Sequence, residues 1–220
     1  NIMNNLAING GPKTKETAFG SGKRWGEPEL IQLAEAIEQN SMFYFFGTKV
    51  KTFLAKFGEM YNTKYVVSTS SGTASIHVAL LAAGVTAGDE VITSPITDMG
   101  SVVGILYQNA IPVFADLDPY TYNMTAETIK AKISDKTKAI VLVHLAGNPC
   151  EMDEIVALCK EKNIKLIEDC AQSYNCYYKG KLAGTFGDYG CFSTNDFKHI
   201  STGDGGMILV NSGDEEDFKK

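Results

Sequence analysis

Short apolar runs alternate with helical segments along most of this 220-residue sequence, and this alternation restricts the fold more than any other feature. Strands are predicted at 65–68, 90–93, 111–115, 139–144, 165–168, 187–193 and 206–211. Helical spacing of apolar residues predicts helices between them, at 73–83, 101–108, 126–133 and 152–162. Regular alternation of this kind is typical of βαβ units. We therefore expect an α/β fold of three αβα layers with a mostly parallel central sheet.

The first part of the chain has a different character. Residues 10–26 are rich in Gly, Lys and Thr, which favours an extended arm over a packed element. Helical spacing resumes at 29–39 and again at 49–61. We expect an N-terminal arm at residues 1–28, followed by one large domain at residues 29–220.

Composition and charge exclude several classes of function. The net charge of −6 comes without a cluster of lysines and arginines, so a nucleic-acid partner is not expected. No run approaches the roughly 18 apolar residues of a membrane span, and residues 1–10 do not resemble a signal peptide. We expect a soluble, cytoplasmic protein without membrane contact.

Cysteine and histidine spacing gives no sign of a metal site. The 5 cysteines form an odd set without a CxxC pair, which favours reduced structural thiols over a disulfide framework or a zinc site. The 3 histidines lie far apart in the sequence. His144 ends a predicted strand, and a buried histidine with its hydrogen bonds satisfied is the favoured interpretation over a role in a site. No metal is expected.

Ser70, Ser71, Gly72 and Thr73 lie between a predicted strand and an almost wholly apolar helix. The N-terminus of a helix offers unpaired N–H groups and a partial positive charge, and a glycine permits close backbone approach. A phosphate group can bind at such a turn. A simple helix cap is the commoner role of these residue types, and it stays open here.

Asp169 follows the predicted strand 165–168, at the edge where parallel sheets bind ligands. A buried carboxylate there can hold a protonated pyridine nitrogen, which keeps the ring able to accept electrons. The alternative is that Asp169 caps the next helix. Gln172 is expected to face the same way on a helical turn and to reach a ring hydroxyl, or else to form exposed helix surface.

Lys198 follows the predicted strand 187–193, which ends in Ser193, and precedes the glycine-rich loop 201–206. A lysine amine becomes a nucleophile when desolvation or a neighbouring cation lowers its pKa. A glycine-rich loop lets the backbone pack around such a side chain. An isolated lysine is more often solvated, so the interpretation depends on the other two segments.

The order of these segments resembles the DegT/DnrJ/StrS family of sugar aminotransferases. The resemblance runs from about Leu6 to the end of the chain, through SSGTASIHVAL, GDEVITSPIT, PVFADLDP, VHLAGNPCEMDEI and IEDCAQSYNCYYKGKLAGTFGDYGCFSTNDFKHISTGDGG. It implies an aspartate-aminotransferase-type fold (fold type I) that binds pyridoxal 5′-phosphate (PLP). It also implies a homodimer with the active site at the subunit interface. The implied reaction moves an amino group from glutamate or glutamine to a keto sugar, often nucleotide-linked, in sugar, cell-surface polysaccharide or antibiotic biosynthesis.

The resemblance also assigns roles to individual residues. Lys198 matches the lysine that forms the Schiff base with PLP, and Asp169 matches the partner of the pyridine nitrogen. Gln172 matches the position beside the ring hydroxyl, and Ser193 matches a phosphate ligand. The residues expected to bind the cofactor are Gly72, Thr73, Ala74, Asp98, Asp169, Gln172, Ser193 and Lys198.

The sequence departs from the family pattern in three places. The loop 203–206 reads Gly-Asp-Gly-Gly, where Glu is commoner in second place. Asp98 stands where many members place a flat side chain over the ring, and an anion is a poor platform for it. Either Met99 or another residue covers the ring, or Asp98 contacts the substrate or the cofactor. Members of the family also continue into a smaller C-terminal domain, which we expect to be absent from this chain.

Two other functions stay open. Related sugar dehydratases use the same scaffold, usually with histidine at the Schiff-base position, and Lys198 therefore favours transfer of nitrogen. A non-catalytic binding or regulatory relative would fit Asp98 and the short chain, but it would not need Lys198 and Asp169.

Overall fold

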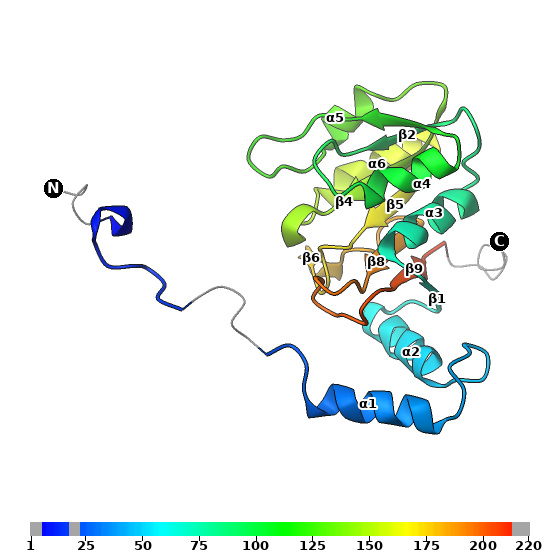
Figure 1. The fold of residues 1–220 in the computed structure, drawn as a ribbon. Coiled ribbons are helices and arrows are strands. Elements are labelled where there is room, and N and C mark those ends of the chain that lie inside the picture. The colour runs from blue at the N-terminus through cyan, green and yellow to red at the C-terminus, as the bar shows by residue number, and fades with distance from the viewer. Residues whose placement is uncertain (1–5, 18–22, 213–220) are drawn as a thin grey trace. The chain divides into compact units, whose positions relative to one another are not determined.

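The computed structural model describes residues 6–17 and 23–212 (Figure 1). Residues 1–5 and 18–22 of the expected arm, and 213–220 of the expected large domain, lie outside the described residues. Backbone proximity groups the chain into two units, Asn1–Lys49 and Val50–Lys220. The expected domain boundary after residue 28 stays a prediction.

The first unit contains a short 3-10 helix, η2, at Ala7–Asn9 and the helix α1 at Glu27–Glu38. α1 begins two residues before the expected start. Glu29 accepts a hydrogen bond from the N–H of Gly26 through Oε2 at 2.7 Å, and Pro28 occupies the first turn. Both features are typical of a helix start. α1 buries none of its side chains, including its apolar ones.

The second unit is built on a seven-stranded sheet in the order β1-β9-β8-β5-β4-β2-β3. The strands are β1 Tyr65–Thr69, β2 Glu90–Thr93, β3 Ile111–Phe114, β4 Thr137–Val143, β5 Lys165–Asp169, β8 Tyr189–Ser193 and β9 Gly206–Val210. Strands β3, β2, β4, β5 and β8 pair in parallel, and β9 pairs antiparallel with both β8 and β1. The prediction of a mostly parallel sheet is therefore confirmed.

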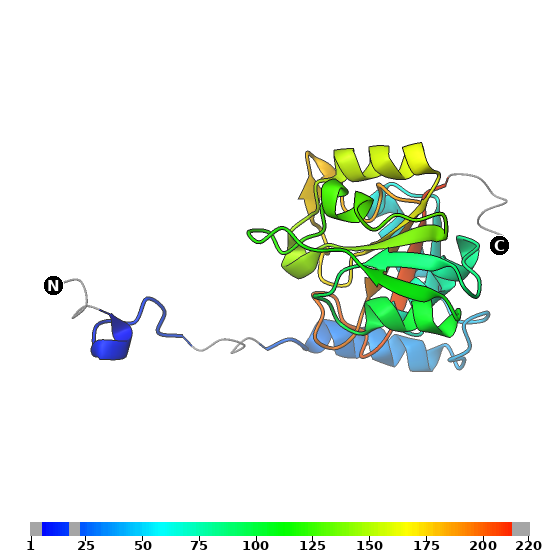
Figure 2. The ribbon, with the colours of Figure 1, turned by 90° about the horizontal axis from the view of Figure 1, so that it is seen from above.

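Helices cover both faces of this sheet. α3 (Gly72–Ala82) and α4 (Gly100–Tyr107) pack on one face, around a core that includes Ile76, Leu80 and Ile167. α5 (Ala126–Lys130) and α6 (Met152–Lys162) pack on the other face, around a core that includes Ile140 and Ile155. Figure 2 shows the sheet between α6, in yellow, and α4, in green. The expected αβα layers are confirmed.

The second helical layer also includes α2 at Lys49–Tyr61. Its Phe57 and Tyr61 rings pack against Phe192 of β8, with ring centroids 5.2 and 5.0 Å away. Both faces of the central strands are covered, so every residue of β8 and β9 is buried. This burial explains why these strands are near-continuous apolar runs in the sequence.

Most predicted elements agree with the structure within two residues. The helix expected at 126–133 is shorter, because α5 ends at Lys130 and a turn leads into β4 from there. A two-stranded hairpin, β6 Tyr177–Tyr178 and β7 Lys181–Leu182, lies outside the main sheet. Lys179 and Gly180 form its turn with φ angles of 48° and 83°. Successive positive φ angles are typical of a tight hairpin turn.

Glu168 is a fully buried carboxylate in β5 that holds a neighbouring turn in place. Its Oε1 accepts hydrogen bonds from the N–H groups of Phe186 and Gly187, each at 2.7 Å. Its Oε2 accepts from the N–H of Gly184 at 2.7 Å and lies 3.0 Å from Nε2 of His144. The charge of this carboxylate is thus satisfied by donors around it.

His144 is fully buried beside Glu168. Its Nδ1 accepts a hydrogen bond from the N–H of Cys150 at 3.1 Å, so the ring proton lies on Nε2 and is donated to Glu168. His144 is therefore the satisfied core histidine that the sequence favoured. Cys170 offers a sulfur atom within 4.8 Å of ligand atoms of both residues. Because His144 and Glu168 already hydrogen-bond to each other and to backbone N–H groups, we interpret them as a structural network.

The described helices include none that is long and apolar enough to cross a membrane.

Replacing Glu168 tests the role of this network in the fold. We expect Glu168→Gln to lower the free energy of unfolding by about 2–4 kcal/mol, because the amide nitrogen of glutamine would face buried N–H donors and leave them unsatisfied. Urea denaturation of both proteins measures this difference. Glu161→Gln is the control, since the Glu161 side chain is 64% exposed. Equal unfolding midpoints for Glu168→Gln and the unchanged protein would contradict the assignment.

Candidate active site

The loops after β1, β2, β5 and β8 meet at one edge of the sheet, because β1 and the parallel strands all end there. A pocket of about 260 Å³ lies at this edge. Each of these loops contributes lining residues. From the predicted site, the pocket collects Gly72, Thr73, Asp98, Asp169, Gln172, Ser193 and Lys198.

The first turn of α3 forms one wall of the pocket. Ser71 caps the helix, since its Oγ accepts a hydrogen bond from the N–H of Ala74 at 3.0 Å. Gly72 lies so close to the end of β8 that an added Cβ would stand 2.6 Å from Cβ of Ser193. Only glycine lets the helix start against this strand. The turn is therefore a helix cap whose free N–H groups could also hold an anion, and Thr73 and Ser193 line the same pocket.

Ala74 is the one predicted phosphate-turn residue whose N–H already has a partner, Ser71. It lies one residue further into α3 than Gly72 and Thr73, which line the pocket. The first N–H groups of a helix have no partner within the helix, so Gly72 and Thr73 carry the anion-binding potential of this turn.

Asp169 ends β5 and is 5% exposed. Its Oδ2 accepts a hydrogen bond from Oγ of Ser101 at 2.6 Å, and its Oδ1 accepts from the N–H of Ala171 at 3.0 Å. Burial raises the pKa of Asp169 above its usual value, although these hydrogen bonds and the charge of Lys198 lower it. A cationic group in the pocket would relieve the cost of the buried charge.

Lys198 lies in the loop between β8 and β9, and the loop is closed by its own hydrogen bonds. The N–H of Lys198 donates to the carbonyl of Asn195 at 2.9 Å, and the Asn195 amide donates to Oδ1 of Asp204 at 2.9 Å. The hydroxyls of Thr194 and Thr202 lie 2.7 Å apart across the loop. These contacts hold the backbone of the loop, and with it Lys198, at the pocket.

Gln172 and Asp98 line the pocket in surroundings that the sequence did not predict. Gln172 lies in a turn, so the expected helical turn is wrong at this point, and its Oε1 accepts from the N–H of Ala146 at 2.8 Å. Asp98 is exposed, and its Oδ1 accepts from the N–H of Gly100 at 2.8 Å, where α4 begins. Asp98 therefore also stabilises the start of a helix. Met99, the suggested substitute platform, is 60% exposed.

Four polar pocket residues were missed by sequence reasoning, namely Thr97, Ser101, Asn195 and Asp204. A signal existed for Ser101, which is a polar residue in the first turn of an otherwise apolar helix, after the loop that follows β2. Thr97 and Asp204 lie in loops at the edge of the sheet where the parallel strands end, and polar side chains in such loops are often functional.

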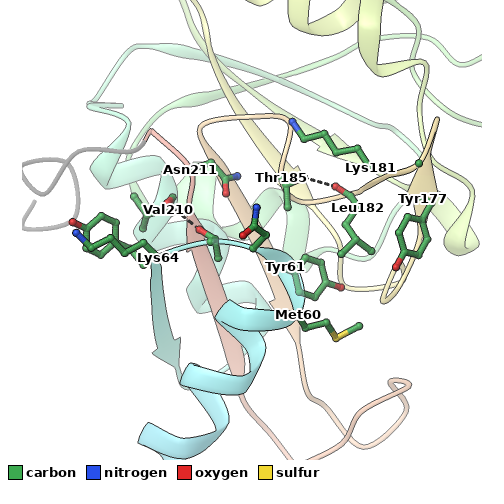
Figure 3. Close-up of a pocket in the computed structure, with 13 residues that line it drawn as sticks. Met60, Tyr61, Lys64, Tyr177, Lys181, Leu182, Thr185, Val210 and Asn211 are labelled. Atoms are coloured by element: carbon green, nitrogen blue, oxygen red, sulfur yellow. Dashed lines mark hydrogen bonds between the residues drawn. The ribbon is translucent and has the colours of Figure 1, made fainter.

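A larger hollow of about 590 Å³ lies at the opposite edge of the sheet, between the end of α2, the hairpin and the end of β9 (Figure 3). Its two lysines, Lys64 and Lys181, lie over the rings of Tyr65 and Phe186, at 4.9 and 4.4 Å from the centroids. The predicted site residues are not part of its lining. The smaller pocket, which contains the predicted catalytic residues Lys198 and Asp169, is therefore the better candidate for the active site.

Comparison with known proteins finds related sequences and structures. Residues 26–219 match the DegT/DnrJ/EryC1/StrS aminotransferase family. GDP-perosamine synthase from Escherichia coli O157:H7 is 46% identical over 165 residues, which are 75% of this chain and 45% of that protein. This chain therefore spans about half the length of the relatives that it matches.

Solved structures of an aminotransferase and a sugar dehydratase share the fold of this chain. The X-ray structure of the aminotransferase from Psychrobacter cryohalolentis matches with a TM-score of 0.84 at 37% identity, over 92% of this chain and 50% of that chain. GDP-4-keto-6-deoxymannose-3-dehydratase with a trapped PLP-glutamate geminal diamine matches with a TM-score of 0.81 at 30% identity, over 90% of this chain and 52% of that chain.

The raised pKa of Asp169 predicts a measurable cost to the fold. Below the usual value of 3.8 the carboxyl is protonated in both folded and unfolded protein. Above it, the unfolded chain ionises more readily than the folded one, so stability falls as the pH rises toward the raised pKa. We expect Asp169→Asn to gain stability over the unchanged protein as the pH rises from about 4 to about 7.

Urea denaturation across this pH range measures the effect. Asp153→Asn is the matched control, because the Asp153 side chain is 61% exposed and Lys179 lowers its pKa. A stability difference between Asp169→Asn and the unchanged protein that is constant with pH would contradict the raised pKa.

Proposed function

This chain belongs to the DegT/DnrJ/EryC1/StrS aminotransferase family. On that premise we propose that it binds PLP and forms the cofactor site of a sugar aminotransferase. One observation carries the proposal. Lys198, Asp169 and the first turn of α3 come from three distant parts of the sequence and line a single pocket. An amine, a buried carboxylate and an anion-binding helix turn are the groups that a phosphorylated pyridine aldehyde needs.

The residues present fit the cofactor. The turn at Gly72 and Thr73, with the Ser193 hydroxyl, would hold the phosphate. Asp169 is buried and its pKa is raised, so a positively charged ring nitrogen beside it would compensate its charge. Lys198 lines the same pocket and interacts electrostatically with Asp169. A Cβ on Gly72 would displace Ser193, so this cradle depends on glycine.

When bound, PLP supplies a ring that accepts the electrons of a broken C–H bond. Nζ of Lys198 would hold the cofactor covalently and, once a substrate amine displaces it, would take a proton from carbon and return it. The Asp169 carboxylate would accept the hydrogen bond of the ring nitrogen and keep that nitrogen protonated. Ser193 and α3 would fix the phosphate group, so that the Lys198 amine would meet the end of the ring opposite the nitrogen that Asp169 binds.

The proposed amino donor is glutamate or glutamine, and the proposed acceptor is a keto sugar, often nucleotide-linked. The support is the similarity to a GDP-perosamine synthase at 46% identity. Asp98 would contact the sugar or the cofactor from the start of α4, because it is exposed in the pocket. The expected cytoplasmic location stays a prediction.

A sugar dehydratase is the second candidate, because one structural neighbour is a GDP-4-keto-6-deoxymannose-3-dehydratase. The residue at 198 favours transfer of nitrogen, since the resemblance places histidine there in dehydratases. A lysine can bond covalently to the cofactor and return a proton to it, as transamination requires. A non-catalytic relative would leave the buried Asp169 charge without a purpose.

The proposed assembly is a homodimer. Apolar side chains of the first unit are widely exposed in the single chain, at 61–77%, and exposed apolar surface of this extent marks a contact site. They are Leu30, Leu33, Ile37, Phe45 and Phe46. Analytical ultracentrifugation is expected to find dimers, and a purely monomeric protein at all concentrations would overturn the proposal.

Isotope transfer distinguishes the two candidate reactions. We expect the full-length protein with PLP, ¹⁵N-glutamate and GDP-4-keto-6-deoxymannose to place ¹⁵N in the sugar, as measured by mass spectrometry. A dehydratase would instead remove an oxygen atom from the sugar and release the nitrogen as ammonia. Lys198→Ala should abolish both the visible absorbance of bound PLP and the transfer.

Lys179→Ala is the control variant, because the Lys179 side chain is 67% exposed and pairs with Asp153. It should transfer ¹⁵N at the normal rate. Unchanged absorbance and turnover in Lys198→Ala would exclude Lys198 as the covalent residue.

A further inference from the structure

Two hydroxyl groups form a hydrogen-bonded chain that ends at the Asp169 carboxylate. Oγ1 of Thr97 is 2.7 Å from Oγ of Ser101, and Oγ of Ser101 is 2.6 Å from Oδ2 of Asp169. Ser101 is 1% exposed and lies in the first turn of α4, while Thr97 precedes that helix. All three residues line the pocket.

The direction of these hydrogen bonds follows from the number of protons. An ionised carboxylate only accepts, so Ser101 must use its single hydroxyl proton for Asp169. Ser101 then has no proton left for Thr97, and Thr97 must donate to Ser101. The chain therefore runs from Thr97 through Ser101 to Asp169, and each bond polarises the next toward the carboxylate.

Asp169 needs such support because of its place in the fold. Burial favours the neutral carboxyl, whereas hydrogen bonds to the charged form favour the carboxylate. The other hydrogen bond, from the N–H of Ala171, is fixed by the backbone turn. A side chain supplies the hydrogen bond to the other carboxylate oxygen, since Oγ of Ser101 donates to Oδ2 of Asp169.

We propose that Ser101, supported by Thr97, is a positioning residue that holds Asp169 as a carboxylate aimed into the pocket. The proposal rests on the proposed function, in which Asp169 keeps the ring nitrogen of PLP protonated. We call the hydrogen-bonded chain from Thr97 through Ser101 to Asp169 the relay. Without it, the proton between Asp169 and the ring nitrogen would move toward Asp169. A neutral carboxyl then donates to the ring nitrogen, and the ring becomes a weaker electron acceptor.

The relay also couples Asp169 to the loop that carries Asp98. Thr97 and Asp98 are neighbours between β2 and α4, and Asp98 binds the N–H of Gly100 at the start of α4. Because Ser101 lies one residue further into that helix, the position of α4 sets both the direction of the Asp169 carboxylate and the place of Asp98. One helix start thus positions both Asp98 and Asp169.

The test reads the ring nitrogen directly in the full-length protein loaded with PLP labelled with ¹⁵N in the ring. The ¹⁵N chemical shift reports whether the nitrogen carries a proton. In the unchanged protein we expect the protonated shift. Ser101→Ala should move the shift toward the unprotonated value and weaken PLP binding about tenfold, the effect of one lost hydrogen bond to a charged group.

Thr97 provides a graded second test on a partly buried side chain. Thr97→Val keeps the shape but removes the donor, so it should move the shift in the same direction by a smaller amount. Thr97→Ser restores the hydroxyl and should restore the shift. Should Ser101→Ala not fold, Thr97→Val decides the question.

Ser94→Ala is the matched control. Ser94 is 3% exposed in the same loop, but its hydroxyl donates to the carbonyl of Ile96 and not to Asp169. It should leave the ¹⁵N shift unchanged even if the loop loses stability. If neither Ser101→Ala nor Thr97→Val changes the ¹⁵N shift, the relay is overturned. If PLP does not bond to Lys198 in the protein without substitutions, the proposed function itself is overturned.

Discussion

A negative charge buried at the end of a central strand is the constraint on which the rest of the site depends. Asp169 is enclosed by its own turn, by α4 and by the sheet, where an unpaired charge is expensive. Its surroundings reduce that cost without removing it, since the pKa stays raised. A fold that keeps a carboxylate under such conditions is prepared for a cationic partner, and the neighbouring Lys198 and α3 turn make a phosphorylated pyridine the fitting one.

Two adjacent carboxylates of β5, Glu168 and Asp169, have different roles. Glu168 and Asp169 point to opposite faces of the sheet, because side chains alternate along a strand. Glu168 is satisfied by backbone N–H groups and His144, and therefore serves the fold. Asp169 has fewer donors and faces the pocket. Two buried carboxylates in sequence thus differ in role because their hydrogen-bond partners differ.

The layers of the fold were predictable because they follow from local pattern. Fully covered strands such as β8 and β9 are mostly apolar, and Gly72 and Ser71 mark a helix start. Lys198 and Asp169 were identified from the order of three segments. The partners of these residues were not predictable, since Ser101 meets Asp169 across 68 residues of sequence. The turn at Gln172 and the antiparallel β9 likewise depend on tertiary contacts, which no local pattern encodes.

The central claim is that the amine of Lys198 and the carboxylate of Asp169 meet opposite ends of one bound pyridine ring. Borohydride reduction of the PLP-loaded protein, followed by peptide mass spectrometry, tests it most directly, because reduction makes the bond between PLP and a lysine permanent. The account predicts one phosphopyridoxyl group, on the peptide that contains Lys198. Label on other lysines only, or no label at all, would contradict it.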